Sequence, residues 1–299
     1  PNMITAVVQE GEGVKGGEPA TWVQGARRAA TTDLLEILAR QSLVARVILV
    51  SPRLGELAGF AVSDYVRSAP GPIHVGDTLG DLIQQYEISH LLYVGGGAAP
   101  LLTEAALADV LKELVQAEAP DGGQPSLAIT NNQFASDWLA LTPATVLQAW
   151  RPRLPRDNML GWVISTEAGV LLRALAPSAA SRLDIDTPAD LLVLRLHPCV
   201  QPHLRRFLDE LPLETGRMQE ALDVLAKPAS HVFIGGRLGP DVWSALNRVT
   251  RSWLRVVSEE RGMVSSGRQA RGEARSLLAA HIEAVGMEAF FATLEEWAE

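Results

Sequence analysis

Short apolar runs that lack alternating polar residues are the feature that most constrains the fold of this chain. They occupy residues 4–8, 45–51, 72–76, 90–96, 126–132 and 161–166. Segments with apolar residues at helical spacing lie between them, at 21–42, 56–67, 78–88, 102–118 and 133–150. A strand that is apolar on both sides has to be covered on both sides. The sequence therefore predicts an α/β fold, in which a mostly parallel sheet carries helices on both faces.

The pattern changes near residue 198, where two prolines interrupt the segment HPCVQPHL. The segments with helical spacing beyond it are 201–211, 216–227, 239–254 and 270–298, and 231–240 is the one strand-like interruption. A chain of 299 residues accommodates one large domain or two smaller ones. We predict an α/β domain over residues 3–197 and a mainly helical C-terminal domain or extension over 198–299.

Charge and composition exclude several classes of partner. The net charge of −9 disfavours binding to nucleic acid or to an anionic membrane, and no apolar run approaches the roughly 20 residues that span a bilayer. The single cysteine, Cys199, has no internal partner for a disulfide, as is usual in a reducing compartment. We therefore expect a cytoplasmic protein without nucleic-acid or membrane partners. Its seven tryptophans leave a homodimer interface open.

Two glycine-rich stretches directly follow predicted strands, at residues 11–17 and 95–97. Ligands of open parallel sheets bind outside the carboxyl ends of the strands, and glycine lets a ligand approach the main chain closely. Main-chain N–H groups there can hold a phosphate or a sugar. The candidate ligand-binding residues are Gly11, Gly13, Lys15, Gly95, Gly96 and Gly97. A tight strand-to-helix turn without a ligand is the alternative interpretation.

Polar residues elsewhere have both a binding and a structural interpretation. Asn131 and Asn132 follow the fifth predicted strand, where paired amides can read the edge of a base or sugar, or cap the next helix. The densest polar stretch, residues 250–276, contains many arginines and several glutamates. Its candidate anion-binding residues are Arg261, Arg268 and Arg271. The alternative is a salt-bridged surface in which the glutamates pair with these arginines.

The segment SRLDIDTPADLLVL, residues 181–194, carries a family resemblance. It resembles the late motif of small nucleotidyltransferases with a GT-A-like fold, among them the molybdenum-cofactor guanylyltransferases and phospholactate guanylyltransferases. The resemblance implies that Asp184 and Asp186 lie near a metal-bound triphosphate. The alternative role of these carboxylates is in capping and turns. Thr187 is expected to cap a helix that begins at Pro188, with Asp190 completing a capping box.

Two further segments, ITAVVQEGEGVKGGEP and LLYVGGGAAPLLT, lie where that family has its N-terminal phosphate loop and its metal-binding Asp after the fourth strand. The resemblance spans residues 4–195. The chain departs from the family in both segments. The loop carries Glu10 and Glu12 with Lys15 as its only cation, and Gly or Ala replaces the Asp.

The resemblance implies transfer of a nucleotidyl group from a nucleoside triphosphate to a small phosphorylated or hydroxyl acceptor, with release of pyrophosphate. Mg²⁺ or Mn²⁺ would be held by Asp184 and Asp186. The alternative is a non-catalytic or repurposed descendant of the fold, which binds a nucleotide or nucleotide-sugar without this chemistry. Glycosyl transfer from a nucleotide-sugar on the same fold also remains open.

Overall fold

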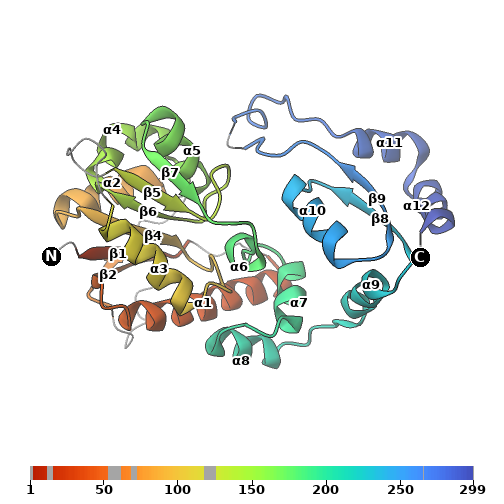
Figure 1. Cartoon of the computed structure of the whole chain (residues 1–299), viewed down its shortest axis with the longest axis horizontal. Coiled ribbons are helices and arrows are strands. Elements are labelled where there is room, and N and C mark those ends of the chain that lie inside the picture. Colours follow the sequence, from red (N-terminus) through yellow and green to blue (C-terminus); the bar gives the residue numbers. More distant parts are fainter. Residues whose placement is uncertain are drawn as a thin grey trace. The chain divides into compact units, whose positions relative to one another are not determined.

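The computed structural model describes residues 3–11, 16–52, 62–68, 73–117, 126–264 and 266–298. The chain divides into two compact units, Pro1–Leu213 and Glu214–Glu299 (Figure 1). The strands of the first unit are β1 Ile4–Gln9, β2 Val44–Ser51, β3 Asp64–Arg67, β4 His90–Gly95, β5 Leu127–Thr130, β6 Trp138–Thr142 and β7 Leu171–Ala174. Its helices are α1 Glu18–Ala39, α2 Val75–Gln85, α3 Glu104–Val115, α4 Leu147–Trp150, α5 Leu160–Trp162, α6 Ala179–Arg182, α7 Pro188–Leu196 and α8 Pro202–Glu210.

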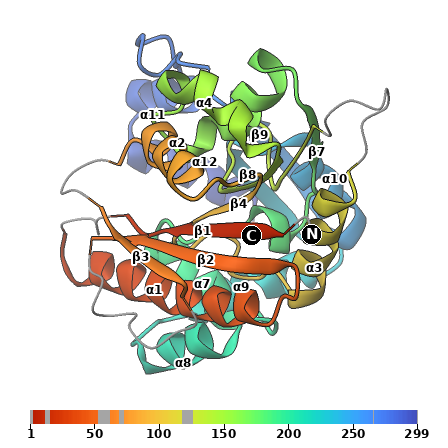
Figure 2. The same cartoon turned by 90° about the vertical axis from the view of Figure 1, so that its left-hand side faces the viewer.

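The seven strands form one sheet in the order β3-β2-β1-β4-β6-β5-β7. All neighbours are parallel except at β6, which runs antiparallel to both β4 and β5. Helices α1 and α3 pack against one face, and α2 with α4 packs against the other (Figure 2). Both faces are therefore buried, which is why the strands contain so few polar residues. The predicted fold class, a mostly parallel sheet with helices on both faces, is confirmed.

Four predicted elements of this unit are wrong. In the helix predicted over residues 56–67, the described residues Asp64–Arg67 form strand β3. Residues 133–150 contain strand β6 rather than one helix, and all five β6 residues are buried between two neighbouring strands. Residues 161–166 are helical, in α5 and a π-helical segment Val163–Glu167, and a strand follows only at β7. The predicted strand over 72–76 includes the start of α2, where the side chain of His74 caps the helix. Short apolar runs do not distinguish a buried strand from a buried helix, because both are apolar on every side.

A third layer of helices extends the first unit beyond residue 197. Helix α8 packs along α1, and Asp33 of α1 accepts hydrogen bonds from the backbone N–H groups of His203 (2.9 Å) and Leu204 (2.9 Å) at the start of α8. Gly25 leaves room for α8, since a Cβ there would lie 2.3 Å from the ring of Phe207. The unit therefore ends at Leu213, and the boundary predicted between residues 197 and 198 is corrected.

The second unit combines helices with a small sheet. It contains helices α9 Gly216–Ala226, α10 Pro240–Val249, α11 Leu277–Val285 and α12 Met287–Trp297, and the strands β8 His231–Gly236 and β9 Trp253–Ser258. The two strands are parallel and are joined through α10. Helix α10 confirms most of the helix predicted over residues 239–254, but it ends at Val249, and strand β9 begins at Trp253. Among the described residues no single helix is long and apolar enough to span a membrane, although α11 and α12, bent by 109°, meet that criterion together.

Candidate functional site

The Asp-Ile-Asp segment (residues 184–186) and the glycine turn (residues 95–97) meet at one edge of the first unit's sheet. Ala98, just after the turn, forms an isolated antiparallel bridge with Asp184. Beside it lies an open cavity of about 550 Å³ at the carboxyl ends of β1 and β4. Polar residues that line it include Gln9, Arg27, Asp137, Arg156, Asp157, Asp184 and Asp186. The structure therefore brings together the two segments that the sequence places at a common edge.

The glycine turn contributes close packing rather than free amide groups. The N–H of Gly95 donates to the carbonyl oxygen of Asp137 (3.0 Å), and the N–H of Gly96 donates to the carbonyl oxygen of Gln9 (2.7 Å). These two donors are engaged within the protein and are not free to hold a phosphate. Both glycines nevertheless line the cavity, and a Cβ at Gly95 would lie 3.0 Å from a carboxylate oxygen of Asp157.

Gly97 has a different role, because its backbone lies against Arg27 of α1. Its φ is +81°, and a Cβ there would lie 2.4 Å from Cγ of Arg27. The Arg27 guanidinium donates to the carbonyl oxygen of Ile185 (2.5 Å) and pairs with the carboxylate of Asp186. Arg27 thus joins helix α1, the glycine turn and the Asp-Ile-Asp segment. The sequence shows no signal for this, since Arg28 stands beside Arg27 in the same helix.

Four carboxylates crowd the cavity, and their environment raises the pKa of three. Burial, followed by the charges of Asp137 and Asp186, raises the pKa of Asp184 to about 7, although the N–H of Ile185 and Arg27 oppose this rise. Burial raises the pKa of Asp137 to about 6, and the charge of Asp157 adds to the effect. Burial also raises the pKa of Asp157. The cavity therefore favours a positive charge or protonated carboxyl groups.

The donor set fits a hard divalent cation only in part. Carboxylate oxygens suit Mg²⁺ or Mn²⁺, and Asp184 and Asp186 line the same cavity as predicted. In the described part of the chain, no group of three or more His, Cys, Asp or Glu side chains is arranged to hold a metal. Mg²⁺ commonly takes one or two carboxylates and completes its shell with water and substrate phosphates. A cation held by Asp184 and Asp186 would therefore need further ligands from water or from a bound phosphate.

Asn131 and Asn132 stabilise the loop between β5 and β6. The side chain of Asn131 is buried, accepts from the N–H of Asp137 (3.0 Å) and donates to the Asp137 carboxylate (2.5 Å). The side chain of Asn132 accepts from the N–H of Phe134 (3.1 Å). Neither asparagine lines the cavity, so the structural alternative holds for both. Asn131 acts indirectly, by positioning Asp137.

The N-terminal loop is described only at its two ends. Gly11 is exposed and lines the cavity, while Gly13 and Lys15 lie outside the described residues, as does Glu12. The carboxylate of Glu10 is buried and accepts from the hydroxyl of Ser51 (2.8 Å). Glu10 therefore points into the protein and does not add to the negative charge that lines the cavity.

Two further residues of the cavity have unused polar groups. Arg156 is exposed and has no ion-pair partner among the described residues, so its charge is available to a ligand. Gln9, at the end of central strand β1, is only 7% exposed, and its Oε1 has no hydrogen-bond partner. A buried polar atom without a partner costs about 1–3 kcal/mol. Such a residue at a cavity is typical of a site that exchanges stability for binding.

Gln9→Leu is therefore expected to raise the free energy of unfolding of the first unit by about 1 kcal/mol, because it removes the unsatisfied buried amide. The same change is expected to weaken binding of any ligand that contacts Gln9. Urea unfolding and ligand-induced thermal shifts measure the two effects. Gln41→Leu, outside the cavity, is the matched control. A Gln9→Leu protein that is less stable than the wild type would show that the amide has an internal role.

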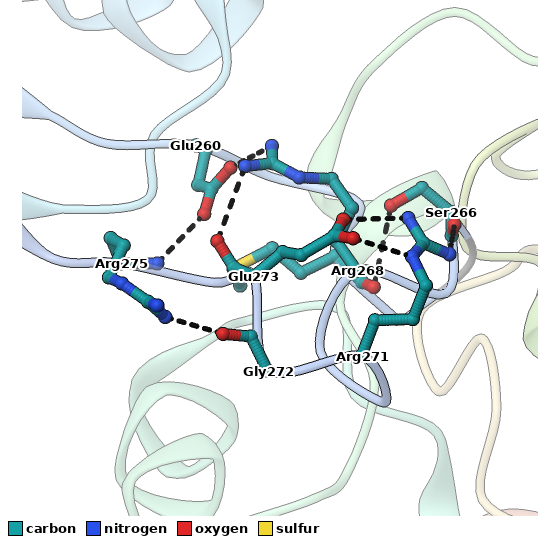
Figure 3. Close-up of polar contacts among 8 residues, drawn as sticks. Glu260, Ser266, Arg268, Arg271, Gly272, Glu273 and Arg275 are labelled. Atoms are coloured by element: carbon teal, nitrogen blue, oxygen red, sulfur yellow. Dashed lines mark hydrogen bonds and ion pairs between the residues drawn. The ribbon is translucent and has the colours of Figure 1, made fainter.

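The predicted anion-binding arginines belong to the second unit, and two of them, Arg268 and Arg271, are paired with glutamates there (Figure 3). Arg271 makes a bidentate pair with Glu273, with contacts of 2.9 and 2.8 Å, and Arg268 pairs with Glu260. The guanidinium of Arg261 lies against Gly239, where an added Cβ would come within 2.4 Å of it. Arg268 and Arg271 are therefore not free to bind an anion. The segment is instead the salt-bridged surface that was the alternative.

Comparisons with known proteins find similar folds but no similar sequences. No protein-family model matches the chain, and no curated protein matches it. Similar solved structures include a cytidylyltransferase from Leptospira borgpetersenii (14% identity, 71% of this chain and 98% of that chain, TM-score 0.47). A 4-diphosphocytidyl-2C-methyl-D-erythritol synthase from Anaerococcus prevotii is 12% identical over 63% of this chain and 94% of that chain, with a TM-score of 0.42.

A CMP:2-keto-3-deoxy-manno-octonic acid synthetase complexed with CTP is also similar, with 14% identity over 64% of this chain and 96% of that chain, and a TM-score of 0.41. The finer resemblance to guanylyltransferases stays a prediction. At these identities and TM-scores the likeness assigns neither a substrate nor a reaction to the chain.

Proposed function

We propose that the cavity binds a nucleoside triphosphate together with Mg²⁺ or Mn²⁺, and that the protein transfers the nucleotidyl group to a small phosphorylated or hydroxyl acceptor. The proposal depends on one observation, the bridge between Ala98 and Asp184. It sets Asp184 beside the glycine turn, at the sheet edge where ligands of such folds bind. The resemblance of residues 181–194 to the late nucleotidyltransferase motif supports the choice of chemistry.

Charge decides how such a ligand can bind. Four aspartates line the described part of the cavity, against Arg27, which is already paired with Asp186, and Arg156. A triphosphate alone would be repelled by these carboxylates. A divalent cation alone lacks a complete set of protein ligands, as described above. We therefore expect the metal and the nucleotide to bind together. The cation would offset the repulsion between the phosphates and the carboxylates, and phosphate oxygens would complete the cation's ligands.

Each residue then has a definite role in the proposed reaction. The acceptor oxygen attacks the α-phosphorus, the bond from that phosphorus to the bridging oxygen breaks, and pyrophosphate leaves with the bonding electrons. A hydroxyl acceptor releases its proton to water in this step. Asp184 and Asp186 would hold the metal, which supplies neutralisation of phosphate charge. Arg27 keeps Asp186 in place through its ion pair. Arg156, which has no partner among the described side chains, is the cation available for a phosphate group.

A thermal-shift panel of nucleoside triphosphates and nucleotide-sugars, each with and without Mg²⁺ or Mn²⁺, tests this proposal. Stabilisation should require both components and should reach about 2.7 kcal/mol when the nucleotide is at 100 times its Kd. Asp184→Ala should abolish it. Asp109→Ala, an exposed position on α3, should leave it unchanged. A nucleotide that stabilises the protein equally without metal would rule out the metal-dependent mechanism.

The second candidate is a nucleotide or nucleotide-sugar binding protein without nucleotidyl transfer. Two observations favour it. Gly or Ala occupies the position of the family's Asp after β4, and the N–H groups of Gly95 and Gly96 donate within the protein. Metal-independent binding without release of pyrophosphate would support this candidate. Release of a nucleoside diphosphate from a nucleotide-sugar would instead indicate glycosyl transfer.

A further inference from the structure

The second unit buries very little of its own apolar surface. Among its described residues Phe290 is the one buried large apolar side chain, whereas the first unit has several dozen buried apolar residues. Sixteen large apolar side chains are exposed in the described part of the chain, four in the first unit and twelve in the second. The second unit is the shorter of the two, so length does not explain why it has three times as many exposed large apolar side chains as the first.

A unit built in this way has an incomplete core. An isolated two-stranded sheet is marginally stable in water, and parallel strands normally have both faces covered. Strand β9 nevertheless exposes Trp253 by 65%, and Val249, just before it, is exposed by 80%. On α12, Met287 and Phe291 are exposed by 60% and 50%. Large exposed apolar groups that cluster in one unit indicate a surface covered by another molecule.

A lipid surface is not a suitable cover. Residues 276–298 contain Glu283, Glu288, Glu295 and Glu296 and no Lys or Arg. Helices that lie on membranes carry Lys and Arg on their polar face, and anionic lipids repel a purely acidic one.

The charges of the second unit are complementary to each other. Residues 237–275 contain eight arginines and four acidic residues, while residues 276–298 are only acidic. Arg248 and Arg251 are exposed and have no ion-pair partner among the described residues. They flank Val249 and Trp253 in the sequence. We name Arg248, Val249, Arg251 and Trp253 the basic patch, and Met287, Glu288, Phe291 and Glu295 the acidic patch.

We propose that the second unit is a homodimerisation module, in which the basic patch of one copy packs against the acidic patch of another. A two-fold axis makes the contact reciprocal, so each copy contributes both patches and no patch is left open. Apolar side chains form the centre of each contact, and Arg–Glu pairs form its rim. This proposal is independent of the chemistry assigned to the first unit.

Sedimentation analysis of the full chain at micromolar concentration tests the proposal. The wild type is expected to be a dimer. Trp253→Glu and Phe291→Glu are each expected to raise the dimer Kd by about thirty-fold or more, since central aromatic residues dominate interfaces. Leu171→Glu, which changes a side chain of the first unit that is 70% exposed, should leave the dimer intact. A monomeric wild type, or variants that dimerise normally, would overturn the proposal.

Mixing the two variants separates loss of the interface from loss of folding. A pair of one Trp253→Glu chain and one Phe291→Glu chain keeps one of its two contacts free of substitutions. The mixture should therefore contain more dimer than either variant alone. A mixture that stays monomeric would contradict the reciprocal contact. Binding of the wild-type chain to phosphatidylcholine–phosphatidylglycerol vesicles, without dimerisation, would show that lipid covers this surface instead.

Discussion

Gly97→Ala is expected to lower the free energy of unfolding of the first unit by about 2–5 kcal/mol. Left-handed backbone at φ +81° disfavours any side chain, by about 1–2 kcal/mol. The new Cβ would also lie 2.4 Å from Cγ of Arg27, and overpacking of this kind costs about 1–3 kcal/mol. Because Arg27 would have to move, its pair with Asp186 should break and ligand-induced stabilisation should be lost.

Gly169→Ala is the matched control for this prediction. Gly169 also has a positive φ, +71°, but a Cβ there would meet nothing within 4 Å. The control should therefore show the backbone strain without the clash and should keep ligand binding. Urea unfolding of both variants measures the difference. Equal destabilisation by the two substitutions would mean that the clash with Arg27 does not contribute to the loss in free energy of unfolding.

Asp184→Asn is expected to stabilise the protein at pH 8 by about 2–4 kcal/mol and to have little effect at pH 4. The pKa of Asp184 in the folded state is about 7, above its ordinary value of 3.8. The folded protein therefore holds a proton that the unfolded chain releases between about pH 4 and 7, and stability falls as the pH rises through that window. The upper limit follows from about 1.4 kcal/mol per unit of pKa difference, and coupling to Asp137 reduces it.

Chemical unfolding across this pH range, without metal or nucleotide, measures the effect. The wild type should lose stability with rising pH more steeply than Asp184→Asn. Asp109→Asn, on the exposed side of α3, should follow the wild-type profile. If Asp184→Asn parallels the wild type at every pH, the carboxylate carries no burial penalty and its pKa is not raised.

The sequence predicts the parts of the fold in which local pattern and burial agree. The apolar runs of β1, β2, β4 and β5 are long enough, and sufficiently bounded by glycine or proline, to be recognised as strands. Strand β6 cannot be recognised as a strand from the sequence, because its five residues are buried on every side and a helical pattern continues through them. Strand β7 carries an exposed Leu171, and Arg173 interrupts its short apolar run.

The candidate site also has one part that the sequence predicts and another part that it does not. The meeting of the glycine turn and Asp184 follows from topology, because parallel strands deliver their carboxyl ends to one edge. The pair between Arg27 and Asp186 joins residues 159 positions apart, and no local pattern marks either partner for the other. The raised pKa values of Asp137 and Asp157 likewise arise from burial in the folded protein, which no local pattern in the sequence marks.

The attachment of α8 to α1 has a practical consequence for dissecting this protein. A gene fragment that stops at residue 197 would remove both N–H donors from the carboxylate of Asp33 and empty the space above Gly25. Arg27 lies on the same helix, two residues after that glycine. Such a truncation would therefore disturb the pocket from its outer side, and an expression boundary intended to preserve it belongs after Leu213.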